Sequence, residues 1–376
     1  MNENISPKKR FGSVKSRIII NTLIIILSFG ISVGLIELFS GGLFTHKIIG
    51  LHDRIVSYHN LLTGLRWPIG SYRYHETIGY EQTPAFSGKL LNNSFYYKTH
   101  ELGYRIPEFA DNRSYESGGV ISLGCSFTFG DGVEAEETFS FLFADRLNKQ
   151  AYNYGVCSYS YTSSLLQLED LHKKGTLEKL KPSIVILGAG GWMIERSLSP
   201  FYPTGGLQFA YAYIGNKDGQ LTILQPKKIY SRKHLYDLVE GYFDGDTRQV
   251  PLTFNRYLRL LSVLPRILKS DFDKIRFKPD DISSRRLYDF VIKRIITLLG
   301  EYSPKLMILW MPHDGRKMDT GLVESVNGFG DVLLVDGLKA LEKKSIDPDL
   351  YYYRHPNRAI HAIYAEQLFR KLKEQN

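Results

Sequence analysis

The chain has 376 residues, with 48 lysines and arginines against 39 aspartates and glutamates, a net charge of +9 and two cysteines. Its length fits about two domains, or one large α/β domain with insertions. With 43% hydrophobic and 23% charged residues, the composition is that of a folded protein. Two cysteines exclude a disulfide-built scaffold and any zinc or iron–sulfur site made of cysteine alone. There is no metal-binding motif of the His-Glu-x-x-His kind, so we expect no metal and no cofactor.

The positive charge is concentrated at the N-terminus. Residues 1–17 contain five basic residues against one acidic residue, and so contribute +4 of the +9. The rest of the chain is only mildly basic, with no compact Lys/Arg face, no zinc-finger spacing and no aromatic RNA-binding signature. We therefore expect no nucleic acid as a partner.

A long apolar segment follows this basic tail. The sequence of residues 18–39 is IIINTLIIILSFGISVGLIELF, with a single charged residue, Glu37, near its end. As a helix this segment extends about 33 Å, enough to cross a bilayer core of about 30 Å. We therefore expect a transmembrane helix. The alternatives are a cleaved signal peptide, with Ser-Gly-Gly at 40–42 as a weak cleavage site, and a buried helix of a soluble protein.

The positive-inside rule orients this predicted transmembrane helix. Residues 1–17 then form a basic cytoplasmic tail, and the chain beyond about Leu43 lies outside the cytoplasm. We expect a single-pass protein of the cell inner (cytoplasmic) membrane, held in the bilayer by residues 18–39. Its C-terminal domain then lies in the periplasm if the source is a Gram-negative bacterium.

Two regions follow the predicted membrane helix. Residues 43–115 are mixed and rich in tyrosine, which predicts a partly β membrane-proximal segment. From residue 116 to 376, apolar strands that end in glycine alternate with amphipathic helices, a pattern typical of βαβ units on a parallel sheet. The strands are expected at 120–123, 151–156, 183–191, 306–312 and 331–337, and the helices at 136–148, 163–180, 285–299 and after residue 355.

Residues 197–285 interrupt this alternation. Segments such as FAYAYIG and LTILQP predict hairpins, and the basic stretch 256–269 predicts a helix. We expect this region to be an insertion, or a lid, on the α/β domain.

Ser126 is the first candidate for chemistry. It lies in Gly-Cys-Ser-Phe-Thr-Phe-Gly, where an apolar strand ends and a helix is about to begin. Ligands collect at the carboxyl ends of strands in open α/β sheets. A serine hydroxyl is a weak nucleophile and needs a base within about 3 Å. The best candidate is His355, in a loop before the terminal helix. The alternative is that Ser126 only caps a helix.

Three sequence blocks together resemble those of the SGNH/GDSL hydrolase family. They are LGCSFTFGDGV at 123–133, NYGV at 153–156 and HPNRAIHAIYAEQL at 355–368. The resemblance covers residues 116–196 and 285–375 and implies a flavodoxin-like three-layer α/β/α fold. It also implies that Ser126 is the nucleophile, that the N–H groups of Ser126 and Gly155 hold the oxyanion, and that His355 is the base. The chain is most similar to membrane-anchored bacterial members, some of which act on O-acyl groups of cell-envelope glycans.

The chain departs from the family pattern in two places. The third block, expected at 188–196, has Trp192 near the place of an oxyanion-binding asparagine, and Tyr352 stands where an aspartate precedes the histidine by three residues. Loss of one oxyanion donor costs about 10²–10³ in rate, and loss of the acid about 10⁴. Three possibilities stay open: Asp349 orients His355, a backbone carbonyl orients it in a Ser–His dyad, or the site is inactive.

The resemblance thus implies a hydrolase that acts on carboxylic ester bonds. We expect a membrane-anchored serine esterase or O-acyl transferase acting on acyl esters, acetyl above all, of extracytoplasmic glycans. The alternative is a catalytically degenerate SGNH domain that binds envelope glycan or a membrane partner. The turn at 124–132 lacks both the P-loop and the dinucleotide-binding spacing, which disfavours a nucleotide-binding protein. Cys125 and Cys157 are expected to form a disulfide or to be two buried thiols.

Overall fold

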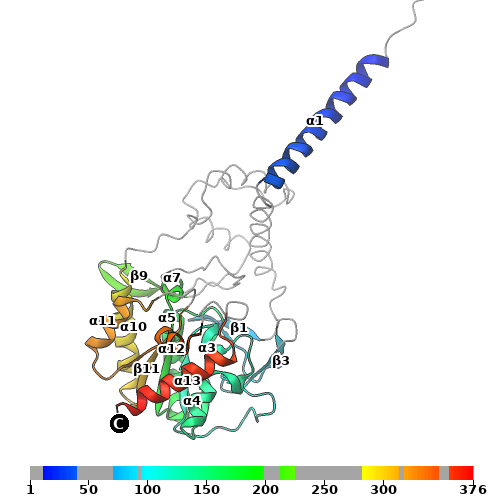
Figure 1. The fold of residues 1–376 in the computed structure, drawn as a ribbon. Coiled ribbons are helices and arrows are strands. Elements are labelled where there is room, and N and C mark those ends of the chain that lie inside the picture. The colour runs from blue at the N-terminus through cyan, green and yellow to red at the C-terminus, as the bar shows by residue number, and fades with distance from the viewer. Residues whose placement is uncertain are drawn as a thin grey trace, which may run out of the picture. The chain divides into compact units, whose positions relative to one another are not determined.

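The computed structural model describes residues 12–39, 71–90, 95–198, 212–224, 282–312, 317–346 and 355–375. The chain divides into two compact units, Met1–His59 and Asn60–Asn376 (Figure 1). In the first unit, helix α1 (Gly12–Phe39) contains the apolar segment 18–39. Among the described residues, no helix is both long enough and apolar enough to span a membrane.

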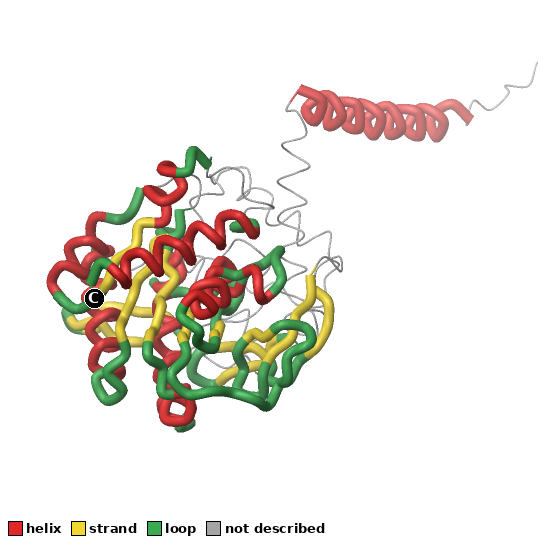
Figure 2. Tube along the Cα trace, turned by 60° about the horizontal axis from the view of Figure 1, so that its bottom comes forward, coloured by secondary structure: helices red, strands yellow, loops and turns green. Residues whose placement is uncertain are grey.

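The second unit is built around one eight-stranded sheet, in the order β12-β11-β8-β6-β7-β5-β4-β3 (Figures 1 and 2). The first five of these strands are mutually parallel. They are β6 (Val120–Leu123), β7 (Ala151–Asn153), β8 (Ile184–Ala189), β11 (Lys305–Trp310) and β12 (Leu333–Asp336). Numbered in chain order among themselves, they stand 2-1-3-4-5, which is the order of flavodoxin-like folds. The structure therefore confirms an α/β fold with a mostly parallel sheet.

Helices cover the parallel part of the sheet in two groups. Strands β6 and β8 are buried at every residue, as expected for strands covered on both faces. Right-handed crossovers place the helix after β6 on one face and those after β7 and β8 on the other. The first group contains α4 (Phe139–Arg146), α12 (Gly337–Lys343) and α13 (Arg358–Lys373). The second contains α5 (Tyr161–Lys173), α6 (Thr176–Leu180), α7 (Trp192–Ser197), α10 (Ser284–Leu299) and α11 (Thr320–Gly328).

Three antiparallel strands extend the same sheet beyond β7. Strand β5 pairs with β7 through Arg105 and Asn153, β4 pairs with β5, and β3 pairs with β4. These strands come from the part of the chain expected to be a membrane-proximal segment. A hairpin from the same part, β1–β2, stands beside the sheet (Figure 1). Their bounds are β1 (Tyr72–His75), β2 (Gly79–Gln82), β3 (Ser87–Leu90), β4 (Phe95–Thr99) and β5 (Arg105–Ile106).

The described part of the expected insertion is a hairpin. Strands β9 (Tyr213–Lys217) and β10 (Gln220–Leu224) pair antiparallel around a two-residue turn. Asp218 and Gly219 in this turn have φ angles of 54° and 82°, as a type I′ turn requires. The basic stretch 256–269, for which a helix was expected, lies outside the described residues.

Candidate active site

A sharp turn after β6 presents Ser126. Gly124 has a φ of 145°, and a Cβ on it would lie 2.3 Å from Thr128 Oγ1, so only glycine fits there. Ser126 is then the first residue of the four-residue helix α3 (Ser126–Phe129), and it is 8% exposed. Its backbone N–H has no hydrogen-bond acceptor among the residues that the structure describes. This N–H is therefore available to a ligand at the carboxyl end of β6.

The C-terminal part of the chain brings His355 to Ser126. The Nε2 atom of His355 lies 2.9 Å from Ser126 Oγ, although 229 positions separate the two residues in sequence. His355 precedes α13, whose start is fixed by Asn357, because the Asn357 side chain accepts the N–H of Ile360 at 3.1 Å. The convergence expected from the sequence is thus present: a serine hydroxyl lies within hydrogen-bond distance of an imidazole nitrogen.

An acidic residue that the sequence did not single out lies beside this pair. Asp131 Oδ2 is 3.7 Å from His355 Nε2, the same nitrogen that faces Ser126. Asp131 directly follows Gly130, whose φ of 86° ends α3, and its N–H donates to Ser126 O at 3.1 Å. The only sequence signal for it was an acid in the Gly-Asp-Gly turn of the nucleophile block itself. Asp349 and Tyr352, where the acid was sought, lie outside the described residues.

Cys157 contacts Asp131 through its thiol. Its Sγ lies 3.2 and 3.3 Å from the two carboxylate oxygens of Asp131. Burial raises the pKa of the Cys157 thiol well above its usual value, and the charge of Asp131 raises it further. The thiol therefore keeps its proton at neutral pH and donates a hydrogen bond to the carboxylate. Cys125 and Cys157 are both free thiols, so the disulfide alternative is not what the structure contains.

Arg105 fixes the loop that carries Asp131. Its guanidinium is fully buried and donates to the carbonyls of Phe129, Gly130 and Val133 at 2.7 to 2.9 Å. It also lies 4.4 Å from the centre of the Phe129 ring. Burial lowers the pKa of Arg105, while the carboxylate of Asp131 acts in the opposite direction. Arg105 comes from β5, outside the blocks that carry the family resemblance, so no sequence pattern pointed to it.

Gly155 has a different role from the expected one. Its N–H donates to Asn153 Oδ1 at 3.0 Å, so the oxyanion role conflicts with an existing bond. A Cβ at Gly155 would lie 2.3 Å from Phe129 N, which shows that the loop after β7 packs directly on the backbone of α3. The Asn153 side chain also donates to Thr128 O at 2.9 Å. Residues 153 and 155 thus hold α3 in place.

Aromatic rings lie next to His355. The ring of Phe127 lies 5.3 Å from His355 and 4.7 Å from Trp192, measured between ring centroids. Trp192 is the first residue of α7, at the place where the third family block has asparagine. The indole packs on the backbone of Gly190, where a Cβ would approach it to 2.4 Å. An aromatic ring therefore stands where the family block has its polar oxyanion donor.

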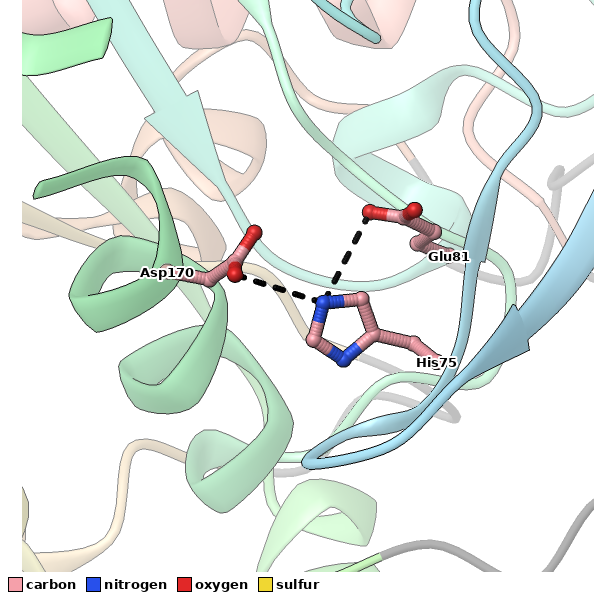
Figure 3. Close-up of side chains that lie close together, drawn as sticks. All are labelled: His75, Glu81 and Asp170. Carbon is pink, nitrogen blue, oxygen red and sulfur yellow. Dashed lines mark ion pairs between the residues drawn. The ribbon is translucent and has the colours of Figure 1, made fainter. Parts of the chain in front are cut away.

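A second cluster of titratable side chains joins the β1–β2 hairpin to α5 (Figure 3). His75 Nε2 lies 3.3 Å from Asp170 Oδ1 and 4.0 Å from Glu81 Oε2. This donor set could in principle hold a cation. However, His75 Nδ1 accepts the N–H groups of Thr77 and Ile78 at 3.2 and 3.3 Å. The neutral ring therefore carries its proton on Nε2, which donates to Asp170 rather than ligating a metal.

The hairpin held by this cluster also reaches the active-site loop. Lys174 Nζ adds an ion pair to Asp170 at 2.5 Å on the helix side. On the other side, the amide of Gln82 donates to Gly155 O, and Tyr80 Oη donates to the carbonyl of Cys157 at 2.6 Å. The β1–β2 hairpin thus links α5 to the loop at 155–157.

Comparison with known proteins gives likenesses of fold. No protein-family model matches the sequence, and no curated protein matches it either. A solved lipolytic protein of the G-D-S-L family from Desulfitobacterium hafniense DCB-2 is 14% identical with a TM-score of 0.32, and the match covers 67% of this chain and 98% of that one. An acetyl xylan esterase, Est2A, from the rumen bacterium Butyrivibrio proteoclasticus is 10% identical with a TM-score of 0.33. That match covers 70% of this chain and 66% of the esterase.

A third similar structure is a carbohydrate esterase family 2 enzyme with a carbohydrate-binding domain from Corynascus thermopiles (Myceliophthora fergusii). It is 11% identical with a TM-score of 0.37, and the match covers 72% of this chain and 69% of that one. All three structures have TM-scores below 0.4. Because the identities are low, the chemistry of this chain has to be inferred from its own site.

Proposed function

We propose that this protein is a serine hydrolase that cleaves carboxylic esters, with Ser126 as nucleophile and His355 as base. The observation that carries the proposal is the 2.9 Å contact between Ser126 Oγ and His355 Nε2 at the carboxyl end of β6. A buried hydroxyl that merely caps a helix needs no imidazole partner, whereas a nucleophilic serine does. The contact joins two segments from opposite ends of the domain, which local helix capping does not explain.

In the first half of the reaction the ester acylates the serine. Ser126 Oγ attacks the ester carbonyl while its proton passes to His355 Nε2, and the carbonyl oxygen becomes an oxyanion near the Ser126 N–H. The tetrahedral intermediate then breaks its bond to the alcohol oxygen. The alcohol leaves with the proton held by His355, and an acyl-enzyme remains on Ser126.

In the second half the acyl group is released. Water, or a sugar hydroxyl in the case of transfer, attacks the acyl-enzyme and gives its proton to His355. The imidazolium returns that proton to Ser126 Oγ as the bond to the acyl group breaks. Hydrolysis yields one acid and one alcohol, and transfer yields a new ester. The two outcomes share the same acyl-enzyme and differ only in the acceptor.

The test is ester hydrolysis by the full chain in detergent, with p-nitrophenyl acetate as substrate. Ser126→Ala removes the nucleophile, and we expect kcat/KM to fall by about 10⁴-fold or more. Thr297→Ala, on the exposed side of α10, is the control and should keep the wild-type rate. If the wild-type protein cleaves no ester, or if Ser126→Ala retains activity, the proposal fails.

The second candidate is a binding protein without chemistry. Trp192 replaces the third-block asparagine, and the Gly155 N–H is already bonded to Asn153. Only the Ser126 N–H then remains of the expected oxyanion donors. An inactive wild-type protein that binds acetylated glycan in a calorimetric titration would favour this second function.

We propose further that the substrate is an acylated glycan outside the cytoplasm and that residues 18–39 anchor the chain in the inner membrane. The half-buried indole of Trp192, which packs on Phe127 beside His355, supports a sugar substrate, because an indole offers a ligand both an apolar face and a polar N–H. The anchor is supported by the sequence, with one charge in an apolar run that follows a basic tail. With the N-terminus in the cytoplasm, the catalytic unit would lie in the periplasm.

A further inference from the structure

We propose that Asp131 is a positioning residue for His355: it supplies the negative charge that stabilises the protonated imidazole during acyl transfer. The proposal rests on the serine-hydrolase function argued above. Asp131 lies in the turn that follows Ser126. From the sequence, the acid was expected near the other end of the domain, just before His355.

The first support is the distance between the charged groups. Asp131 Oδ2 lies 3.7 Å from His355 Nε2, and that nitrogen gains the proton of Ser126 in the transition state. A carboxylate at this distance attracts the developing imidazolium charge. The two side chains are 16% and 29% exposed, so solvent weakens this attraction only in part. The acid thus acts on the proton acceptor and not on the substrate.

The second support is that Asp131 is held from several sides. Its N–H is tied to Ser126 O, so the acid and the nucleophile belong to one turn. The Cys157 thiol donates to both carboxylate oxygens at 3.2 and 3.3 Å. Arg105 fixes the carbonyls of Gly130 and Val133 on either side of it in the chain. A carboxylate that served only solubility would need none of these contacts.

The contacts also explain why a thiol is suited to position 157. A second full positive charge at position 157, in addition to that of Arg105, would compensate Asp131 further and weaken its action on His355. The protonated Cys157 thiol donates a weak hydrogen bond and leaves the carboxylate its charge. The thiol therefore orients Asp131 without neutralising it.

The experiment compares pH–rate profiles of ester hydrolysis by the full chain in detergent. For Asp131→Asn we expect kcat to fall about 10- to 100-fold, with KM within about threefold of wild type. Because Asp131→Asn removes a negative charge next to the reacting proton, the acid limb of the profile should move to lower pH. Asp131→Glu keeps the charge and should keep the wild-type acid limb.

Three further variants serve as controls. Glu136→Gln removes one charge at an exposed position five residues away and should leave both kcat and the profile unchanged. Cys157→Ala should lower kcat by several-fold and Cys157→Ser should restore most of it, because serine is also a donor. This pair tests the proposal even if Asp131→Asn does not fold.

The outcomes separate this proposal from the proposed function. An Asp131→Asn protein with an unshifted acid limb overturns the positioning role, whether its kcat falls or not. The positioning role is also overturned if the acid limb of Asp131→Glu moves as far as that of Asp131→Asn. It is overturned as well if Cys157→Ala and Cys157→Ser have equal kcat values. In each case Ser126→Ala still decides independently whether the protein is a serine hydrolase.

Discussion

His361 shows how burial fixes the protonation of a single residue. It is fully buried, and its Nδ1 accepts the N–H of Phe139 at 3.1 Å. Burial above all, with smaller electrostatic contributions from Arg105 and His355, lowers its pKa to about 3. The ring is thus neutral in the folded protein, and His361 acts as a packed helix residue six positions after the catalytic candidate His355.

This low pKa predicts a pH-dependent stability. In the unfolded chain an ordinary histidine has a pKa of about 6.5, so the unfolded state binds more protons than the folded state between about pH 6.5 and 3. The contribution of His361 is therefore fully present above pH 6.5 and is lost as the pH falls towards 3. The expected slope is about 1.4 kcal/mol of unfolding free energy per pH unit in that window.

His361→Asn tests this expectation, because an asparagine oxygen can still accept the N–H of Phe139 but does not titrate. We expect a destabilisation of about 1–3 kcal/mol at pH 7 from lost packing. Between pH 6 and 4 the unfolding free energy of the variant should fall less steeply than that of the wild type, by about 1.4 kcal/mol for each pH unit. Urea unfolding at pH 7, 6, 5 and 4 gives both curves. If the unfolding free energies of the variant and the wild type fall in parallel with pH, His361 is not the source of the pH dependence.

At the scale of elements, the antiparallel strands β3–β5 belong to the same unit and the same sheet as the candidate site. Strand β5 covers the edge of β7, and its Arg105 satisfies carbonyls of the loop at 129–133. Tyr104, just before β5, packs edge-on against Tyr152 and Tyr154 at centroid distances of 5.3 and 5.6 Å. A chain cut before residue 116 would expose the edge of β7 and leave buried carbonyls without donors.

A pair of fragments tests the contribution of these strands. Residues 60–376 retain all the strands of the sheet, and we expect a single cooperative melting transition. Residues 116–376 lack β1–β5, and we expect them to lose cooperative melting or to melt at least about 10 °C lower, since several kcal/mol of contacts are removed. Circular dichroism at 222 nm follows both. A 116–376 fragment that melts within about 3 °C of the longer one would show that β3–β5 are dispensable.

Elements with long apolar runs could be predicted from the sequence, and contacts between distant residues could not. Strands β6, β8, β11 and β12 lie where apolar runs ending in glycine or proline placed them. The helix expected at 163–180 is instead divided at Gly175, whose φ of 68° ends α5 before α6 begins. Helices α11 and α12 were not predicted, because each is short and only partly apolar.

The candidate site also contains residues that the sequence could predict and residues that it could not. Ser126 and His355 stand in blocks with distinctive neighbours, so their pairing could be expected before any coordinates. Asp131 and Arg105 could not be assigned, because their roles depend on which backbone and side chains fold against them. Gly155 was expected to bind an oxyanion, whereas its close approach to α3 is visible only in three dimensions.

At the scale of the whole molecule, the chain divides into two units that carry different features. Unit Asn60–Asn376 contains the complete sheet and the site, and unit Met1–His59 contains α1. The described side chains of α1 are exposed, with isoleucines, leucines and a phenylalanine among them. These apolar residues belong to the segment 18–39, for which the anchor is proposed.

The proposed anchor predicts how the chain partitions in cells. The full chain should stay with the membrane pellet after an alkaline carbonate wash, whereas residues 60–376 expressed alone should stay in the supernatant, because they lack the apolar run at 18–39. Protease added to intact spheroplasts should then degrade the catalytic unit of the full chain, since the positive-inside rule places it outside the cytoplasm. Release of the full chain by carbonate would contradict the anchor. Protection of the catalytic unit from protease would contradict the orientation, and neither result would alter the chemistry assigned to Ser126.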